Sequence, residues 1–167
     1  MVLMNGLIVA VGQYLLFLIL FTAAVIWLYL PRQDKVGMAV QAIVSLVIAV
    51  ILIKLAGAIH TDPRPFAVDP SIKPLFPHPA DNGFPSDHTA LAVTVSLLVM
   101  IHRRWLGAVL LAASIMLGAA RMAAHVHHAQ DIVAGLLIAA LAVGIASATW
   151  RWVRPQLPQR PTEPASV

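Results

Sequence analysis

Long apolar segments dominate this chain and constrain its fold more than any other feature. Five can be drawn, and a membrane-crossing helix needs about 20 apolar residues or slightly fewer. Their expected bounds are residues 7–30, 36–59, 87–104, 105–124 and 132–150. The third is short, because its uninterrupted apolar part covers only residues 89–101. These segments predict an all-α integral membrane helical bundle with about five transmembrane helices.

Composition supports this class and excludes others. The chain is 60% hydrophobic and 11% charged, whereas soluble proteins carry about 25% charged residues. Since it has no cysteine, disulfides and thiolate chemistry are excluded. The first apolar segment lacks a basic region before it and is long for a signal peptide, so we expect a retained span. We expect residues 1–154 to form one transmembrane domain and the proline-rich residues 155–167 to form a disordered cytoplasmic tail.

The basic residues are distributed unevenly between the two ends of the expected bundle. Seven of the eleven lysines and arginines fall at one end, in residues 32–35, 102–104 and the C-terminal 151–160. The other end holds Lys54, Arg64, Lys73 and Arg121. By the positive-inside rule the first end is cytoplasmic. The second end then faces the periplasm or the exterior, which predicts a multi-pass protein of a plasma membrane.

Three polar islands, residues 62–66, 83–88 and 121–131, all fall at this second end. Ionisable groups near membrane helices usually have a function. His127 and Asp131 are spaced i, i+4 and share a helix face. A carboxylate on one imidazole nitrogen fixes the tautomer and leaves the other nitrogen free as a nucleophile. Alternatively, Asp131 is a helix N-cap and His127 an interfacial residue; both readings can hold at once.

The same islands carry cations suited to an anion. Arg121 lies within two helical turns of His127 and can grip phosphate oxygens bidentately. Arg64 lies between two prolines, which hold its backbone extended. Lys54 near the end of the second segment reaches toward the same side. The alternatives are end-of-span snorkelling for Arg121 and Lys54 and a solvated loop charge for Arg64.

Residues 85–88 read Pro-Ser-Asp-His and predict the start of the third helix. Free N–H groups at a helix N-terminus bind phosphate, and Ser86 lies there. His88 in that first turn can protonate a leaving oxygen. Plain capping by Ser86 or Asp87 is the alternative reading. His125 and His128 raise the further alternative of a metal site, although few carboxylates lie near them in the sequence.

Taken together, the islands resemble the type 2 phosphatidic acid phosphatase superfamily of membrane lipid phosphatases. That family has the motifs Lys-x6-Arg-Pro, Pro-Ser-Gly-His and Ser-Arg-x5-His-x3-Asp. The third motif matches from Arg121 to Asp131, with Ala120 for serine and His125 where glycine is usual. The second has Asp87 for glycine, and the first has Lys54 ten residues before Arg64 instead of seven. The motif variants Asp-Pro-Arg-Pro-Phe and Phe-Pro-Ser-Asp-His most resemble those of the bacitracin-resistance-type undecaprenyl diphosphatases of bacteria.

The resemblance implies a role for each matched residue. His127 attacks phosphorus and forms a phosphohistidine, Asp131 orients it, and His88 protonates the leaving oxygen. The phosphoryl oxygens are held by Arg64, Arg121, Ser86 and Lys54. No metal or cofactor is implied, because the cations supply the positive charge. The expected activity is hydrolysis of undecaprenyl diphosphate to undecaprenyl phosphate. The alternatives are another lipid substrate (phosphatidic acid, phosphatidylglycerophosphate or lipid A) or a histidine-rich metal-binding membrane protein.

Overall fold

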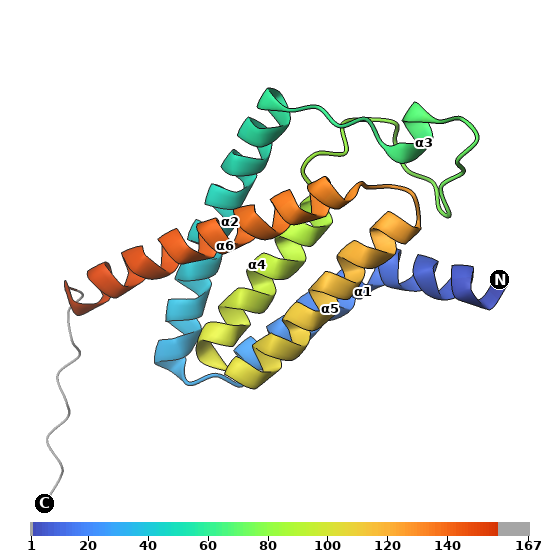
Figure 1. Ribbon diagram of the computed structural model, residues 1–167. Helices are drawn as coiled ribbons and strands as arrows, with labels where there is room; N and C mark the ends of the chain where they lie inside the picture. Colours follow the sequence, from blue (N-terminus) through green and yellow to red (C-terminus); the bar gives the residue numbers. More distant parts are fainter. Residues whose placement is uncertain (1, 157–167) are drawn as a thin grey trace, which may run out of the picture.

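A computed structural model describes residues 2–156, and these residues fold as a bundle of helices (Figure 1). The helices, in chain order, are α1 (Val2–Leu28), α2 (Arg32–Ile59), α3 (Pro65–Val68), α4 (Asp87–His102), α5 (Arg104–Ala123), α6 (Ala129–Val153) and the short 3₁₀ helix η1 (Arg154–Gln156). The predicted all-α class is confirmed. Residues 157–167, most of the expected disordered tail, lie outside the described residues.

Each of the five expected segments corresponds to one helix, with ends displaced by a few residues. Four helices are long and apolar enough to cross a membrane on their own: α1, α2, α5 and α6. The fifth, α4, has 16 residues, which is about 24 Å at 1.5 Å per residue and shorter than a hydrocarbon core of about 30 Å. α3, one turn within the long loop, was not predicted.

The short helix α4 lies at the centre of the bundle (Figure 1) and packs against α1, α2, α5 and α6. Its eight buried residues cover most of its circumference, so its neighbours rather than lipid surround it. Hydrogen bonds between helices reinforce the packing. Ser96 of α4 bonds to Ser114 of α5 at 2.9 Å, and the Ser147 hydroxyl of α6 donates to the Gln41 side chain of α2 at 3.1 Å. Such bonds help to hold helices together in a membrane, where lipid is as apolar as the helix surfaces and apolar burial gives little driving force.

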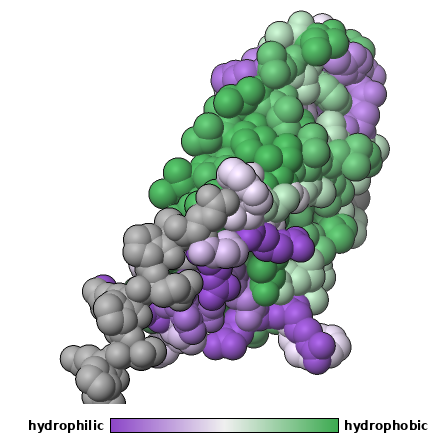
Figure 2. All heavy atoms as spheres, turned by 90° about the vertical axis from the view of Figure 1, so that its left-hand side faces the viewer, coloured by the Kyte–Doolittle hydropathy of each residue, from purple (hydrophilic) through white to green (hydrophobic). Residues whose placement is uncertain are grey.

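The outer surface of the bundle is apolar, as contact with a lipid bilayer requires. Figure 2 shows a continuous hydrophobic region, with hydrophilic residues gathered at the lower end of this face and along its upper edge. Large apolar side chains stay exposed on the long helices, among them Phe21 at 67% and Leu137 at 65%. Exposed apolar area on this scale marks a lipid-facing surface. The chain is therefore a multi-pass membrane protein.

The polar loop between α2 and α4 is folded over the upper ends of the helices (Figure 1). Asn82 ties it to the end of α2. Its side-chain oxygen accepts hydrogen bonds from the backbone N–H groups of Asp62 and Phe84 at 2.9 and 3.0 Å. Its amide nitrogen donates to the carbonyls of Gly57 and His60, both at 3.2 Å. The loop is thereby held in place above the first turn of α4.

Candidate active site

A cavity of about 370 Å³ lies beneath this loop. It is bounded by the end of α2, the loop, the first turn of α4 and the junction between α5 and α6. Five residues predicted from the sequence line it: Lys54, Arg64, His88, Arg121 and His127. They come from positions as far apart as 54 and 127, so the fold brings the three polar islands together.

His127 lies at the wall of this cavity and is 4% exposed. Its Nδ1 is 3.1 Å from Oδ2 of Asp131, which is fully buried. The same oxygen accepts the backbone N–H of His128 at 2.8 Å. Because His128 is the N-cap of α6 and Asp131 its third residue, this second bond also caps the helix. Asp131 therefore combines the two alternatives that the sequence left open, although from the N3 position rather than the N-cap.

Two arginines converge on the other imidazole nitrogen of His127. Its Nε2 lies 3.3 Å from Arg64 Nη1 and 3.5 Å from Arg121 Nη2. A guanidinium only donates hydrogen bonds, so Nε2 must be the acceptor. We therefore assign the tautomer with the proton on Nδ1, donated to Asp131. A lone pair flanked by two guanidinium groups is the arrangement that nucleophilic attack on a bound phosphoryl group needs.

The surroundings of His127 keep it neutral. Burial lowers its pKa below the ordinary value of 6.5, and the positive charges of Arg121 and Arg64 lower it further. The hydrogen bond and negative charge of Asp131 raise the pKa, but they only partly offset these effects. The net direction is downward. At neutral pH the imidazole is unprotonated and Nε2 is available.

Arg64 is 6% exposed and rigidly held. Its Nε donates to Asp81 Oδ1 at 2.8 Å, and its Nη1 donates to the Val126 carbonyl at 2.7 Å. Burial tends to raise the pKa of Asp81, but the hydrogen bond and charge of Arg64 lower it more. Asp81 thus stays ionised and orients the guanidinium. Pro65 begins α3 directly after Arg64, which fixes the backbone as the flanking prolines predicted.

Arg121 is 2% exposed in the last turn of α5. Its Nη1 donates to the Gly12 carbonyl of α1 at 3.1 Å, and its guanidinium carbon lies 5.9 Å from the Phe76 ring centroid. Its Nε is buried with no hydrogen-bond partner among the described residues. The groups that Arg121 contacts directly are neutral, so its positive charge and its free N–H group can bind an anion.

His78, a loop residue outside the three polar islands, also lines the cavity. Its Nε2 lies 3.0 Å from Arg121 Nη2, and its ring centroid lies 6.2 Å from that of His127. Burial lowers its pKa, and Arg64 lowers it further. Neutral His78 therefore accepts a hydrogen bond from Arg121. No spacing rule relates His78 to the other motifs, so its place could only come from the fold.

The remaining predicted residues occupy different positions. His88 is half-buried in the first turn of α4 and lines the cavity. Lys54 is exposed at the cavity edge. The Ser86 hydroxyl is fully buried, bonds to the Thr89 hydroxyl at 3.1 Å and accepts the Thr89 N–H at 3.4 Å. Ser86 thus caps α4, and its role in phosphate binding stays a prediction.

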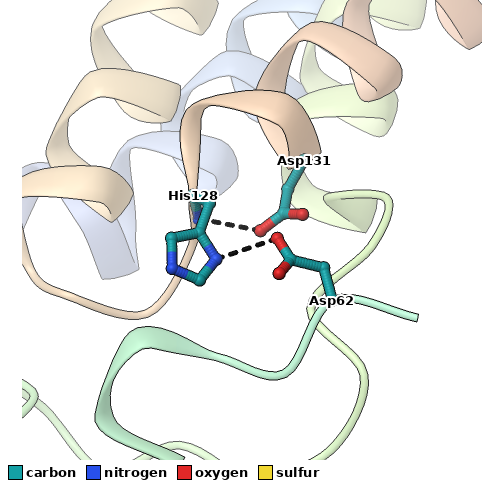
Figure 3. Close-up of side chains that lie close together, drawn as sticks. All are labelled: Asp62, His128 and Asp131. Atoms are coloured by element: carbon teal, nitrogen blue, oxygen red, sulfur yellow. Dashed lines mark hydrogen bonds and ion pairs between the residues drawn. The ribbon is translucent and has the colours of Figure 1, made fainter. Parts of the chain in front are cut away.

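Behind His127, a second histidine–carboxylate pair joins the polar islands (Figure 3). His128 Nδ1 donates to Asp62 Oδ2 at 2.8 Å, while the backbone of His128 bonds to Asp131. Burial tends to raise the pKa of Asp62, but hydrogen bonds, including the one from His128, lower it. Asp62 lies two residues before Arg64, so this pair couples the loop carrying the arginine to the segment carrying the nucleophile.

The same three residues are the described group with metal-ligand geometry. One ligand atom from each of Asp62, His128 and Asp131 lies within 4.8 Å of the others. These atoms already form hydrogen bonds with one another and with His127. A metal ion bound to Asp131 Oδ2 would compete with the bonds from His127 and His128. The other oxygen, Oδ1, is buried with no hydrogen-bond partner among the described residues. His125, the other histidine considered for a metal, is exposed.

His125 has a backbone φ of 60°, in the left-handed region that favours glycine. Glycine is the usual residue at this position in the family that the polar islands resemble. The turn between α5 and α6 explains that preference, because it reverses the chain between Arg121 and His127.

Comparison with known proteins identifies the family of this chain. A family model described as the PAP2 superfamily matches residues 38–156. A Bacillus licheniformis protein named bacitracin transport permease protein BcrC is 30% identical over 155 residues, which cover 92% of this chain and 73% of that protein. The undecaprenyl-diphosphatase BcrC of Bacillus subtilis is 25% identical over 136 residues, covering 81% and 69% of the two chains.

A solved structure has the same fold. The crystal structure of Aquifex aeolicus LpxE superimposes with a TM-score of 0.72 at 20% identity, covering 87% of this chain and 86% of that one. The family match extends well beyond the residues that carried the resemblance. It includes most of α2 and all of α4, α5 and α6. The resemblance read from the polar islands is confirmed: this chain belongs to the PAP2 superfamily.

Proposed function

We propose that this protein is a membrane lipid phosphatase that hydrolyses undecaprenyl diphosphate to undecaprenyl phosphate through a phosphohistidine. The observation that carries the proposal is the environment of His127. One nitrogen is held by Asp131 at 3.1 Å, and the other faces Arg64 and Arg121 at 3.3 and 3.5 Å inside the cavity. Three relatives carry undecaprenyl-diphosphatase in their names: one from Bacillus subtilis, one from Sulfolobus acidocaldarius and one, named as putative, from Escherichia coli.

In the first step, the terminal phosphoryl group lies between Arg64 and Arg121. Nε2 of His127 attacks phosphorus, and the bond from phosphorus to the bridging oxygen breaks. His88, which lines the same cavity, gives a proton to that oxygen. The negative charge of Asp131 stabilises the positive charge that develops on the imidazole. The arginines stabilise the charge on the transferring group, which is the main requirement of phosphoryl transfer.

In the second step, His88 takes a proton from water, and the water oxygen attacks the phosphohistidine. Inorganic phosphate leaves and His127 returns to its neutral form. Lys54 adds positive charge at the cavity edge, where a diphosphate presents more negative charge than a monophosphate. The group leaving in the first step is a phosphate monoester, which is easier to expel than an alkoxide. Both points favour a diphosphate substrate.

The test measures kcat/KM for phosphate release from undecaprenyl diphosphate and phosphatidic acid in one detergent. We expect a clear preference for the diphosphate. His127→Ala should remove nearly all turnover. His88→Ala should also be inactive on lipid but partly rescued by a substrate with a good leaving group. His102→Ala, at the opposite end of α4, is the matched control and should remain active. A preference for phosphatidic acid would transfer the assignment to another lipid phosphatase.

A metal-dependent mechanism is the rival from another class, motivated by the cluster of Asp62, His128 and Asp131. Under the phosphohistidine mechanism, activity should survive EDTA, and acid-labile phosphate should accumulate on the protein when the reaction is stopped rapidly. Loss of activity on chelation, with recovery on adding zinc or magnesium, would favour the rival instead.

The orientation in the membrane is also part of this proposal. Arg32, Lys35, Arg103 and Arg104 lie at the end of the bundle opposite the cavity, in or beside the first turns of α2 and α5. This asymmetry supports a cytoplasmic lower end and an active site facing the periplasm or exterior of a bacterial plasma membrane. A reporter fused after Val167 should be active only in the cytoplasm. A C-terminal reporter active only in the periplasm would reverse the orientation.

A further inference from the structure

A second cavity of about 380 Å³ lies beside the first, between α1 and the long loop. Three residues line both cavities: His78, His88 and Arg121. The nucleophile His127 lines the first cavity, whereas Tyr14 and Phe17 of α1 line the second. The two spaces therefore meet at the proton donor and at one phosphate-binding arginine.

The wall of the second cavity differs in chemistry from that of the first. Apart from the shared residues, this wall consists of aromatic rings, prolines and the side chain of Gln13. Phe76 is 6% exposed and packs close to Gly12 of α1, forming a firm inner wall. Tyr14 and Phe17 are each 64% exposed on the outer surface of α1. The cavity therefore opens sideways, toward lipid.

The mechanism dictates which part of the substrate lies there. In phosphoryl transfer the nucleophile and the leaving oxygen lie roughly in line on opposite sides of phosphorus. His127 attacks from the first cavity, and His88 protonates the departing oxygen. The leaving group, which carries the lipid chain, must then extend past His88, and the second cavity begins at that residue.

We propose that the second cavity binds the first isoprene units of the lipid chain and guides the substrate sideways from the bilayer along α1. This proposal rests on the diphosphatase function proposed above. At about 30 Å³ per water-sized group, the space holds only the beginning of a long chain. The rest of the chain would lie along Tyr14 and Phe17 in the membrane. His78 and Arg121, shared by both cavities, would then contact the phosphate that stays with the lipid.

The test compares farnesyl diphosphate with methyl diphosphate, which has no chain to bind. Gln13→Trp should fill the cavity, and Phe17→Ala should remove part of its wall. In both variants the ratio of kcat/KM for farnesyl diphosphate to that for methyl diphosphate should fall tenfold or more. Phe21→Ala removes an equally exposed ring one turn further along α1, outside the cavity, and should leave the ratio unchanged. An unchanged ratio in both cavity variants, or an equal fall in Phe21→Ala, would overturn the proposal.

A second measurement locates the chain without relying on turnover. A photoreactive farnesyl diphosphate analogue bound to inactive His127→Gln should label the part of α1 around Phe17. The competing route is past Ile53 and Gly57 of α2, which line the first cavity. Labelling of α2 in place of α1 would refute the α1 route while leaving the phosphatase function intact. Failure of wild-type protein to hydrolyse either diphosphate would instead refute the proposed function.

Discussion

Gly135 of α6 provides a sharp test of how the bundle positions the catalytic groups. A Cβ built there would lie 2.9 Å from the Ser86 carbonyl oxygen and 3.2 Å from the Ala90 nitrogen. Both are backbone atoms of the first turn of α4, the turn that carries His88, so they cannot move aside as a flexible side chain would. Overpacking of this kind costs about 1–3 kcal/mol. Alanine also gains about 1 kcal/mol in helix propensity over glycine. Gly135→Ala should therefore leave unfolding free energy unchanged or lower it by up to about 2 kcal/mol.

Gly144 is the matched control, because it lies in the same helix with nothing within 4 Å of a built Cβ. Gly144→Ala should keep the propensity gain, so the two variants should differ by about 1–3 kcal/mol. The assay is unfolding in detergent, paired with kcat/KM for phosphate release. Because relief of the clash moves His88 away from His127, Gly135→Ala should also lose activity, whereas Gly144→Ala should not. Equal stability and full activity in both variants would refute the close packing of α6 on α4.

Further outcomes are expected from single changes around the site. Asp131→Asn removes the negative charge that raises the pKa of His127, so that pKa should fall further. The acid limb of the kcat/KM profile should then move to lower pH, and kcat should drop by about 10²–10⁴-fold. A limb moving to higher pH would contradict the electrostatic argument. His125→Gly should raise the free energy of unfolding by about 1 kcal/mol at unchanged activity, since φ is 60° at this position. His125→Ala should give no such gain, and unfolding in detergent compares the two. Asp62→Asn weakens the bond to His128 and should lower kcat more than it changes KM; an effect on KM alone would argue against a brace behind the nucleophile. Inorganic phosphate at about 100 times its Kd should raise stability by about 2.7 kcal/mol, which a thermal shift against chloride at equal ionic strength would detect.

The helical architecture was predictable because length and apolarity are properties of continuous sequence. The helix ends agree within a few residues, and some coincide with a local signal such as Pro31 or the Ser86 cap. Candidate catalytic residues were predictable too. The pairing of His127 with Asp131 was predicted, but the reason given for it, a shared helix face, was wrong. His127 precedes α6, which begins at Ala129, and Asp131 reaches back to it from the first turn of that helix.

Other parts of the site depend on contacts between distant residues. The bond from Arg121 to His78 spans 43 positions, and the bond from His128 to Asp62 spans 66. Asn82 joins a loop to a helix end through four backbone groups, which no local spacing reports. Loop residues of this kind read as interfacial or solvated from sequence alone, because their partners are set by how the loop folds back over the bundle.

The energetic cost of burying two arginines at this site indicates which kind of ligand it binds. Arg64 is matched by Asp81, whose side chain is 60% exposed, so one positive charge is largely balanced at the surface. Arg121 instead contacts a carbonyl and two neutral histidines, and its buried Nε has no hydrogen-bond partner among the described residues. A buried cation without a counter-ion is destabilising, and such conflicts with local stability concentrate at functional sites. An anion between the two arginines would relieve it. A phosphoryl group would therefore supply the counter-charge that no carboxylate bonded directly to Arg121 provides, at the place where His127 attacks.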